Sequence, residues 1–449
     1  MNKIKKKKCN FKLIFWELNE INFKYVHMYI QNGSLPNWKK FIDQYGICST
    51  ISEKSYQELE PWIQWPTVRT GLSYKEHGVF RLGDVEKNKH RQHWEILEDK
   101  GYSVAAISPI NASNNTNHSP FWIPDPWVDT KISGNGFVKR IAKAINQAVN
   151  DNSKEKLEAK TVVTLLEALI TKSQFTSWPQ YVISLFGALK KQHWSKAILL
   201  DRLLADVFIS LWKKHKPDFS VLFLNSGAHV QHHYMCSAMP YTGTVKNPAW
   251  YIKSHQDPLL ELLEMYDAIL GDLIKLKDTR LIVSTGLQQV PYEQPDFYWR
   301  LKNHDMFLSR IGVKFSRVHP RMTRDFLLEF DNYQDLSNAK SLLSKVVSQD
   351  GEKIFKELDD RGNDLFVSLT YNKEIKDDFS LYLNGTEYQN FRNDIAFVAI
   401  KNGHHHGTGY YLDSFKSSKD SKEDIPLQDL FKVVMSHFSI HADIHKSHN

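Results

Sequence analysis

Short apolar runs alternate with segments of helical period along much of the chain. Each run is too short for an independent helix and is bounded by polar or turn-forming residues, which is typical of buried strands. Strands are expected over residues 12–17, 102–108, 219–224 and 280–284. Helices are expected between them, including one that ends near residue 31 and others over 94–100, 258–276 and 427–438. The alternation predicts an α/β fold with a mainly parallel central sheet and helices on both faces.

Two stretches depart from this alternation. Residues 138–214 are almost wholly helical in period, with an apolar stripe that includes Val162, Val163, Leu166 and Leu169, and predict a helical insertion or cap. Residues 326–330, 336–347 and 365–370 predict a small α+β insertion. We therefore divide the chain into a basic tail (1–10), core α/β (11–135), helical insertion (136–215), core (216–312), small α+β insertion (313–390) and C-terminal core (391–449).

Composition narrows the class of protein. The chain has 449 residues, is 41% hydrophobic and carries a formal charge of +7, part of it in the run Lys3 to Lys8. These values fit a globular protein with a sizeable core. We interpret the basic run as a solvated tail that contacts anionic membrane lipids through Lys5 to Lys8, and we expect no nucleic-acid partner.

Cysteine usage and the absence of long apolar segments suggest a compartment. Cys9, Cys48 and Cys236 are odd in number and irregularly spaced, which favours reduced thiols over a disulfide framework or a zinc site. No run matches the apolar core of a secretory signal or a spanning helix. The sequence predicts a cytoplasmic protein that can contact the inner face of the membrane.

Candidate chemistry gathers at the ends of the predicted strands. Glu17, Asn225 with His229, Thr285, and the triple histidine 404–406 each lie on or just after a strand. The carboxyl ends of parallel strands share one edge of the sheet, where open α/β folds place their sites. We expect these segments, and the turn that contains Glu60, to meet in one hollow.

The stretch from Glu60 to Gly78 contains residues suited to binding a substrate. Aromatic faces stack on sugars or bases, and arginines bind phosphate, although the same residues also serve as core or paired side chains. The predicted substrate-binding residues are Trp62, Trp65, Arg69, Arg81, Asn19 and Gln64. The predicted catalytic residues are Glu60, His229, His232 and Thr67, with Glu60 or His229 as the general base.

Two spacings carry a family resemblance. Thr70-Gly71 is followed six residues later by His77-Gly78, and Leu35-Pro36-Asn37 forms a turn near the first helix. This pattern resembles the alkaline phosphatase superfamily, specifically its type I phosphodiesterase/nucleotide pyrophosphatase branch. The resemblance implies a phosphate-directed enzyme in which a first-strand Asp, a Thr nucleophile, an Asp and a His four residues apart, an Asp-His pair and a late His bind two zinc-like ions.

The family's residues carry over only in part. Glu17 stands for the first Asp, Asn225 and His229 for the spaced pair, and His406 for the late His. The nucleophile position falls on Pro61, and Thr285-Gly286 replaces the Asp-His pair. With so few carboxylates, two tightly held ions would be poorly neutralised. Two alternatives follow: one zinc or manganese ion on Glu17, Asn225, His229 and His406, or metal-free acid–base chemistry.

These observations give a leading functional hypothesis and two alternatives. We expect an enzyme acting on a phosphate-linked substrate, a sugar nucleotide or glycan phosphate, by hydrolysis or group transfer in surface-glycan assembly. The first alternative is a glycosyltransferase that has borrowed the scaffold. The second is a catalytically inactive relative that binds a glycan or a partner.

Overall fold

The computed structural model describes residues 10–150, 158–294, 296–321, 324–420 and 424–440. The basic run Lys5 to Lys8 lies outside these residues. The chain forms two compact units, one of residues 1–242, 255–290 and 404–449, the other of residues 243–254 and 291–403. Within the described residues no helix combines the length and apolar character needed to cross a bilayer.

The first unit is built on a mixed, mostly parallel sheet, which confirms the predicted fold class. Its eight strands lie in the order β19-β2-β18-β6-β1-β5-β3-β4. The strands β6, β1, β5, β3 and β4 run parallel, whereas β18 is antiparallel to both β6 and β2. Their bounds are β1 (Lys12–Leu18), β2 (Cys48–Ile51), β3 (Val104–Ile107), β4 (Trp122–Ile123), β5 (Phe219–Leu224), β6 (Thr279–Ser284), β18 (Thr408–Asp413) and β19 (Ile425–Pro426).

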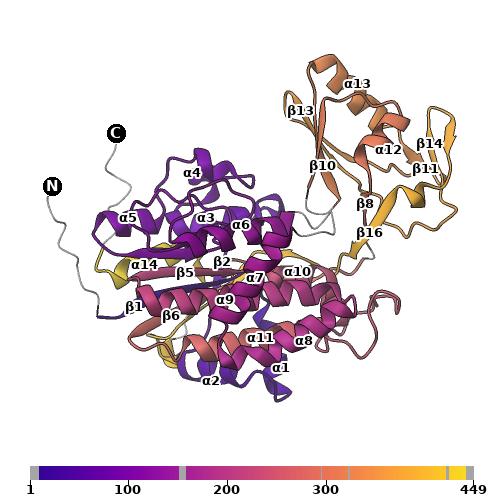
Figure 1. The fold of residues 1–449 in the computed structure, drawn as a ribbon. Coiled ribbons are helices and arrows are strands. Elements are labelled where there is room, and N and C mark those ends of the chain that lie inside the picture. The colour runs from indigo at the N-terminus through magenta and orange to yellow at the C-terminus, as the bar shows by residue number, and fades with distance from the viewer. Residues whose placement is uncertain (1–9, 151–157, 295, 322–323, 421–423, 441–449) are drawn as a thin grey trace. The chain divides into compact units, whose positions relative to one another are not determined.

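Strand β1 is buried on both faces because helices cover the sheet on both sides (Figure 1). Leu13 and Phe15 face a core formed with α3 (Pro61–Thr70), α5 (His93–Asp99) and α14 (Asp429–His437). Trp16 points the other way and contacts Trp38 and Tyr266. Alternate residues of a strand face opposite sides, so a continuous apolar run is needed when both sides are packed.

The remaining helices of this unit include those expected to end near residue 31 and to span 258–276, whereas α4 and α10 lie where no helix was expected. Helices α6 to α9 occupy the region predicted as a helical insertion, and α9 packs against both β5 and α11. The bounds are α1 (Phe23–Gln31), α2 (Pro36–Tyr45), α4 (Tyr74–His77), α6 (Gly136–Asn150), α7 (Ala159–Lys172), α8 (Trp178–Leu189), α9 (His193–His215), α10 (Ser226–Tyr234) and α11 (Pro258–Leu273).

The second unit has its own apolar core and contains the residues predicted as a small α+β insertion. It holds a four-stranded sheet, β12-β13-β10-β9, and a three-stranded sheet, β11-β14-β15. Its elements are β8 (Phe297–Leu301), α12 (His304–Arg310), β9 (Arg317–Pro320), β10 (Asp325–Glu329), α13 (Tyr333–Leu343), β11 (Val347–Ser348), β12 (Glu357–Asp360), β13 (Asp364–Ser368), β14 (Leu381–Leu383), β15 (Thr386–Tyr388) and β16 (Ile395–Ile400).

One boundary differs from the expectation. Residues 395–400 do not return to the main sheet, because β16 pairs with β8 inside the second unit. An apolar strand carries no local information about which strand it will pair with. The second unit therefore begins earlier and ends later than the predicted insertion.

Candidate functional site

Three side chains from distant parts of the first unit converge on one point. Oε2 of Glu20 lies 3.2 Å from Nε2 of His232 and 3.2 Å from Nε2 of His405. One ligand atom from each residue lies within 4.8 Å of the others. Glu20 follows β1, His232 lies on α10, and His405 lies on β17 (Gly403–His406), which pairs with β7 (Gln288–Pro291). We call these three residues the Glu20 cluster.

Hydrogen bonds from neighbouring residues fix both the backbone and the carboxylate of Glu20. Its backbone N–H donates to the Thr285 carbonyl at 3.1 Å, and its carbonyl accepts from Gln289 N and Gln231 Nε2. Its carboxylate accepts from Asn19 Nδ2 at 2.9 Å and from Gln289 Nε2. The residue is buried with φ of 65°, an uncommon backbone conformation outside glycine. The turn is thus fixed so that this carboxylate faces the two imidazoles.

The electrostatics of Glu20 favour its charged form. Burial would raise the pKa of the carboxyl, but the charges of His405 and His232 and their hydrogen bonds outweigh it and hold the pKa well below its ordinary value. An ionised carboxylate beside two imidazole nitrogens is a donor set that suits a divalent transition metal.

His405 lies between two carboxylates. Its Nε2 faces Glu20, and its Nδ1 lies 3.4 Å from Oε2 of Glu60, the N-cap residue of α3. A carboxylate behind the second nitrogen of a histidine fixes the ring orientation and the tautomer, as it does behind metal-binding histidines. Glu60 therefore positions His405 and leaves Nε2 directed toward Glu20.

A buried polar network anchors the helix that carries His232. Asp201 of α9 accepts hydrogen bonds from the N–H of Ser226, the first residue of α10, at 2.8 Å and from the Tyr266 hydroxyl at 2.7 Å. Burial raises the pKa of Asp201. His229 lies one turn before His232, and its pKa is lowered to about 4 by burial and by the nearby His232 and His193. A neutral imidazole of such low basicity is a weak general base at pH 7.

Glu17 has a different role from the expected metal ligand. Its two carboxylate oxygens accept hydrogen bonds from Arg69, and both side chains are fully buried. Arg69 also donates to the Ile110 carbonyl and lies over the rings of Trp65 and Trp94. The arginine predicted to bind phosphate is thus occupied inside the protein.

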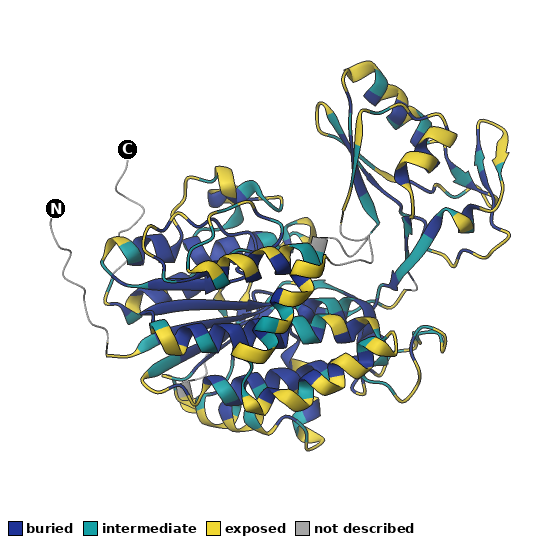
Figure 2. Ribbon diagram, viewed as in Figure 1, coloured by how far each residue is buried: buried dark blue, intermediate teal, exposed yellow. Residues whose placement is uncertain are grey.

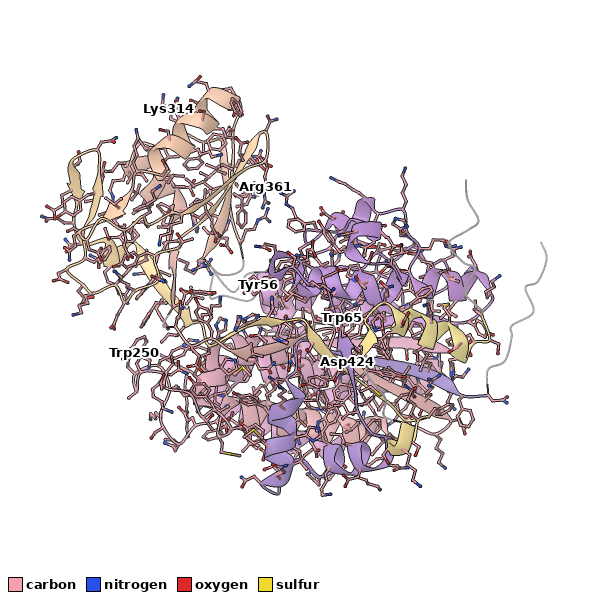
Figure 3. The ribbon with its side chains drawn as sticks, turned by 180° about the vertical axis from the view of Figure 1, so that it is seen from behind. Tyr56, Trp65, Trp250, Lys314, Arg361 and Asp424 are labelled. Atoms are coloured by element: carbon pink, nitrogen blue, oxygen red, sulfur yellow. The ribbon has the colours of Figure 1, made fainter. Side chains whose placement is uncertain are left out.

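Three other predicted substrate-binding residues, Trp65 and Gln64 of α3 and Asn19, are buried in the protein. Trp65, labelled in Figure 3, is fully buried and donates from Nε1 to Oδ1 of Asn19 at 2.9 Å. Gln64 is fully buried and donates to the Glu58 carbonyl at 2.6 Å. Asn19 also donates to Asn225 at 2.8 Å. Trp65 therefore supports the cluster indirectly, since it bonds to Asn19 and Asn19 in turn donates to the carboxylate of Glu20.

Thr67 pairs with a histidine, but the pair is not an activated nucleophile. Thr67 Oγ1 lies 3.0 Å from His77 Nε2, and both side chains are buried. His77 Nδ1 accepts from the N–H of Val79, so Nε2 carries the proton and donates it to Thr67. Burial also lowers the pKa of His77 to about 4. This imidazole has no free lone pair with which to take the hydroxyl proton.

The other predicted residues lie at the surface or beside the cluster. His406 is exposed and accepts from the N–H of Thr408 through Nδ1. Trp62 is half-buried and donates to the Phe80 carbonyl, and Arg81 is exposed. Asn225 bonds to Asn19 and so adjoins the Glu20 turn. The structure thus brings together five expected segments, but through Glu20 and His405 instead of Glu17 and His406.

The sequence contains only part of the information that decides which of the three histidines 404–406 faces Glu20. Successive side chains of a strand point to opposite sides, so His404 and His406 of β17 face one side and His405 faces the other. His405 faces Glu20, whereas His404 lies near the ring of Tyr56. The register that decides between the two faces comes from the pairing of β17 with β7.

The donor set fits one metal ion better than two. The carboxylate of Glu17, the other acid expected to bind metal, is bound to Arg69. The Glu20 cluster supplies one carboxylate oxygen and two imidazole nitrogens that all lie within 4.8 Å of one another. Three protein ligands with an open position is the usual arrangement of a catalytic zinc site.

Comparisons with known proteins find similarity in structure alone. No protein-family model and no curated protein sequence matches the chain. The structure is similar to phosphonoacetate hydrolase from Sinorhizobium meliloti 1021, with 12% identity, 96% of each chain covered and a TM-score of 0.45. It is also similar to murine ectonucleotide pyrophosphatase/phosphodiesterase 5, with 12% identity, 96% of each chain covered and a TM-score of 0.41.

A third similar structure is alkaline phosphatase from the Antarctic bacterium TAB5, with 9% identity and a TM-score of 0.39. It covers 96% of this chain and 99% of the other. Alkaline phosphatase and nucleotide pyrophosphatase/phosphodiesterase are also the kinds of protein that the spacing of Thr70-Gly71 and His77-Gly78 resembles.

Proposed function

We propose that the Glu20 cluster binds one divalent transition-metal ion, zinc or manganese, and that the first unit uses it to cleave or transfer a phosphate-linked group. The observation that carries the proposal is the convergence of Glu20, His232 and His405 within coordination reach. When bound, such an ion polarises a phosphoryl oxygen and lowers the pKa of a water molecule. The substrate class that we propose is a sugar nucleotide or glycan phosphate in the cytoplasm.

The protein groups around the cluster support this reading. Glu20 supplies the negative charge, and Asn19 and Gln289 orient its oxygens. Glu60 is half-buried beside His405, where a carboxylate can hold the ring and accept a proton from an acceptor hydroxyl or water. The buried Thr67 is not available for a covalent intermediate, so direct attack by water or an acceptor is the proposed route.

Metal content and turnover test the proposal together. The purified protein is treated with a chelator, reloaded with zinc or manganese, and its metal content is measured by mass spectrometry. We expect about one metal ion per chain in the wild type. His232→Ala and His405→Ala should each hold less than a tenth of that, because an ion with only two protein ligands is bound far more weakly. Turnover is followed with bis-(p-nitrophenyl) phosphate and a panel of sugar nucleotides, with and without sugar acceptors.

His319→Ala is the matched control, because His319 also pairs with a glutamate, Glu329, at 2.8 Å but lies in the second unit. It should keep wild-type metal content. Turnover without bound metal would overturn the role of the ion and favour acid–base chemistry by Glu60. If the protein neither binds metal nor turns over any substrate, the inactive, glycan-binding alternative is favoured. If turnover occurs only with an acceptor, group transfer is favoured over hydrolysis.

A further inference from the structure

Helix α7 turns polar and small side chains toward the protein and apolar side chains toward the surface. The side chains that it buries are Thr161, Thr164 and Ala168, spaced three and four residues apart. The side chains that it exposes include Val162, Val163, Leu166 and Ile170. A helix on the surface of a water-soluble unit ordinarily buries its apolar stripe and exposes its polar one. Three residues of the apolar stripe seen in the sequence, Val162, Val163 and Leu166, therefore face outward, and Leu169 is half-buried.

Helix α8 shows the same inversion more strongly. It buries Tyr181, Ser184 and Gly187 and exposes six large apolar side chains, which are Trp178, Val182, Ile183, Leu185, Phe186 and Leu189. Leu189 is 80% exposed, and Phe175, in the turn before α8, is 92% exposed. Figure 2 shows the outward sides of α7 and α8 as exposed.

The orientation of α8 is fixed from the inside. The hydroxyl of Tyr181 donates to Asp206 of α9 at 2.7 Å, and Ser177 donates to the same carboxylate at 3.0 Å. Asp206 is also paired with Arg202, and all of these side chains are buried. A Cβ on Gly187 would lie 2.2 Å from Oγ of Ser195, so the two helices approach closely there. Rotating α8 to bury its apolar side would leave these polar groups unsatisfied.

Charge on this surface is positive. Between Glu158 and Lys191 the sequence has four lysines and two acidic residues, Glu158 and Glu167, and Glu158 pairs with Lys160 at 2.7 Å. Glu167 is bound to Arg140 by two hydrogen bonds of 2.7 and 2.8 Å. Lys190 and Lys191 follow α8 directly and are exposed, and within the described part of the chain no carboxylate pairs with them.

We propose that the exposed apolar faces of α7 and α8, with Phe175 between them, dock on the surface of an anionic lipid bilayer. An apolar helical face that carries Trp and Phe and is bordered by lysines is typical of helices that lie in the membrane interface. At 14 and 12 residues, α7 and α8 are shorter than the roughly 20 apolar residues needed to span. The apolar side chains enter the interface, and the lysines meet anionic head groups.

A second copy of the chain is a poorer occupant. A two-fold interface places the same patch of both copies together, so two positively charged surfaces would meet. Anionic lipid removes this repulsion and supplies an apolar layer of the right depth. Bilayer docking therefore satisfies both the charge and the apolar area of the surface.

Vesicle flotation tests the docking. The wild type should bind vesicles of phosphatidylcholine with phosphatidylglycerol and bind pure phosphatidylcholine vesicles more weakly. The variant Phe175→Ser/Ile183→Ser/Leu189→Ser should reduce the partition coefficient at least about tenfold, because it removes three apolar side chains from the interface. Lys190→Gln/Lys191→Gln should reduce binding to anionic vesicles by roughly fivefold per lysine and leave less dependence on salt.

The control variant Met306→Ser/Tyr333→Ser changes two exposed residues of the second unit and should bind like the wild type. Unchanged thermal unfolding of all variants establishes that folding is intact. A second control replaces the five lysines of the basic run, Lys3 and Lys5 to Lys8, by Gln. Loss of binding in that variant, with the triple serine variant unaffected, would overturn the proposal in favour of the basic tail. A wild-type dimer in solution that the triple serine variant dissolves, without vesicle binding, would overturn it in favour of self-association.

Discussion

The guanidinium of Arg69 donates hydrogen bonds to both carboxylate oxygens of Glu17, and both side chains are fully buried. Burial raises the pKa of Glu17, and the charge and hydrogen bonds of Arg69 offset only part of that rise. Removing one partner leaves the other charge buried and uncompensated. We expect Arg69→Met to lower the free energy of unfolding by about 3–5 kcal/mol, measured by denaturant unfolding.

Replacing both partners should cost less than replacing one. Glu17→Leu/Arg69→Met removes both charges, so its loss in the free energy of unfolding should be smaller than that of Arg69→Met alone. Arg140→Met, which breaks an exposed pair with Glu167, should cost less than about 1 kcal/mol. Equal losses in the buried and exposed arginine variants would show that the Glu17 pair does not have the structural role assigned to it.

Gly71 ends α3 at a point where no side chain fits. Its φ is 73°, and a Cβ there would lie 2.7 Å from the Phe431 ring of α14. We expect Gly71→Ala to lower the free energy of unfolding by about 2–4 kcal/mol through backbone strain and overpacking. Gly33 has a φ of 87° with no atom within 4 Å of a Cβ, so Gly33→Ala should show only the backbone part, about 1 kcal/mol.

His77 should make stability fall in acid. Burial lowers its pKa to about 4 from 6.5, so between these values the unfolded chain binds more protons at this site than the folded one. The free energy of unfolding therefore falls as the pH drops below about 6.5, by about 2 kcal/mol at pH 5. In His77→Gln the loss between pH 7 and pH 5 should be smaller than in the wild type by that amount.

His118→Gln is the control for this comparison, because His118 is exposed. Its stability should fall between pH 7 and pH 5 as much as that of the wild type. A pH dependence that is the same in His77→Gln and in the wild type would contradict the burial of a neutral imidazole beside Thr67.

Asp201 should matter for both stability and the Glu20 cluster. Asp201→Ala removes the acceptor for the Ser226 N–H and for the Tyr266 hydroxyl, and we expect a loss of about 2–3 kcal/mol in the free energy of unfolding. Because α10 carries His232, zinc binding measured by calorimetry should weaken as well. Ser73→Ala, which removes a capping side chain from α4, should cost about 1 kcal/mol and leave zinc binding unchanged.

Bound metal should stabilise the first unit by mass action. With free zinc at about 100 times its dissociation constant, the free energy of unfolding should rise by about 2.7 kcal/mol, and a chelator should reverse the change. Glu20→Gln removes the anionic ligand, so its thermal unfolding should not respond to zinc. A zinc response that survives in Glu20→Gln would place the ion elsewhere in the protein.

The strands of the main sheet could be predicted because their signal is local. A strand packed on both faces must be almost wholly apolar, and β5, in which Ser220 is the single polar residue, appears in the sequence as a short apolar run bounded by polar residues. The same argument fails for β16, whose apolar sequence fits a buried strand in either unit. Its partner, β8, is chosen by contacts nearly a hundred residues away along the chain.

The sequence by itself determined the α/β class, the order of most elements and the segments that meet at the candidate site, because periodicity and strand ends are properties of neighbouring residues. Only the tertiary structure decided that Glu20 faces the histidines while Glu17 is bound to Arg69, and that His405 is the imidazole turned inward. It also decided that Val162, Val163 and Leu166 of α7 face outward. Each of these depends on register or helix rotation, which are set by partners distant in the chain.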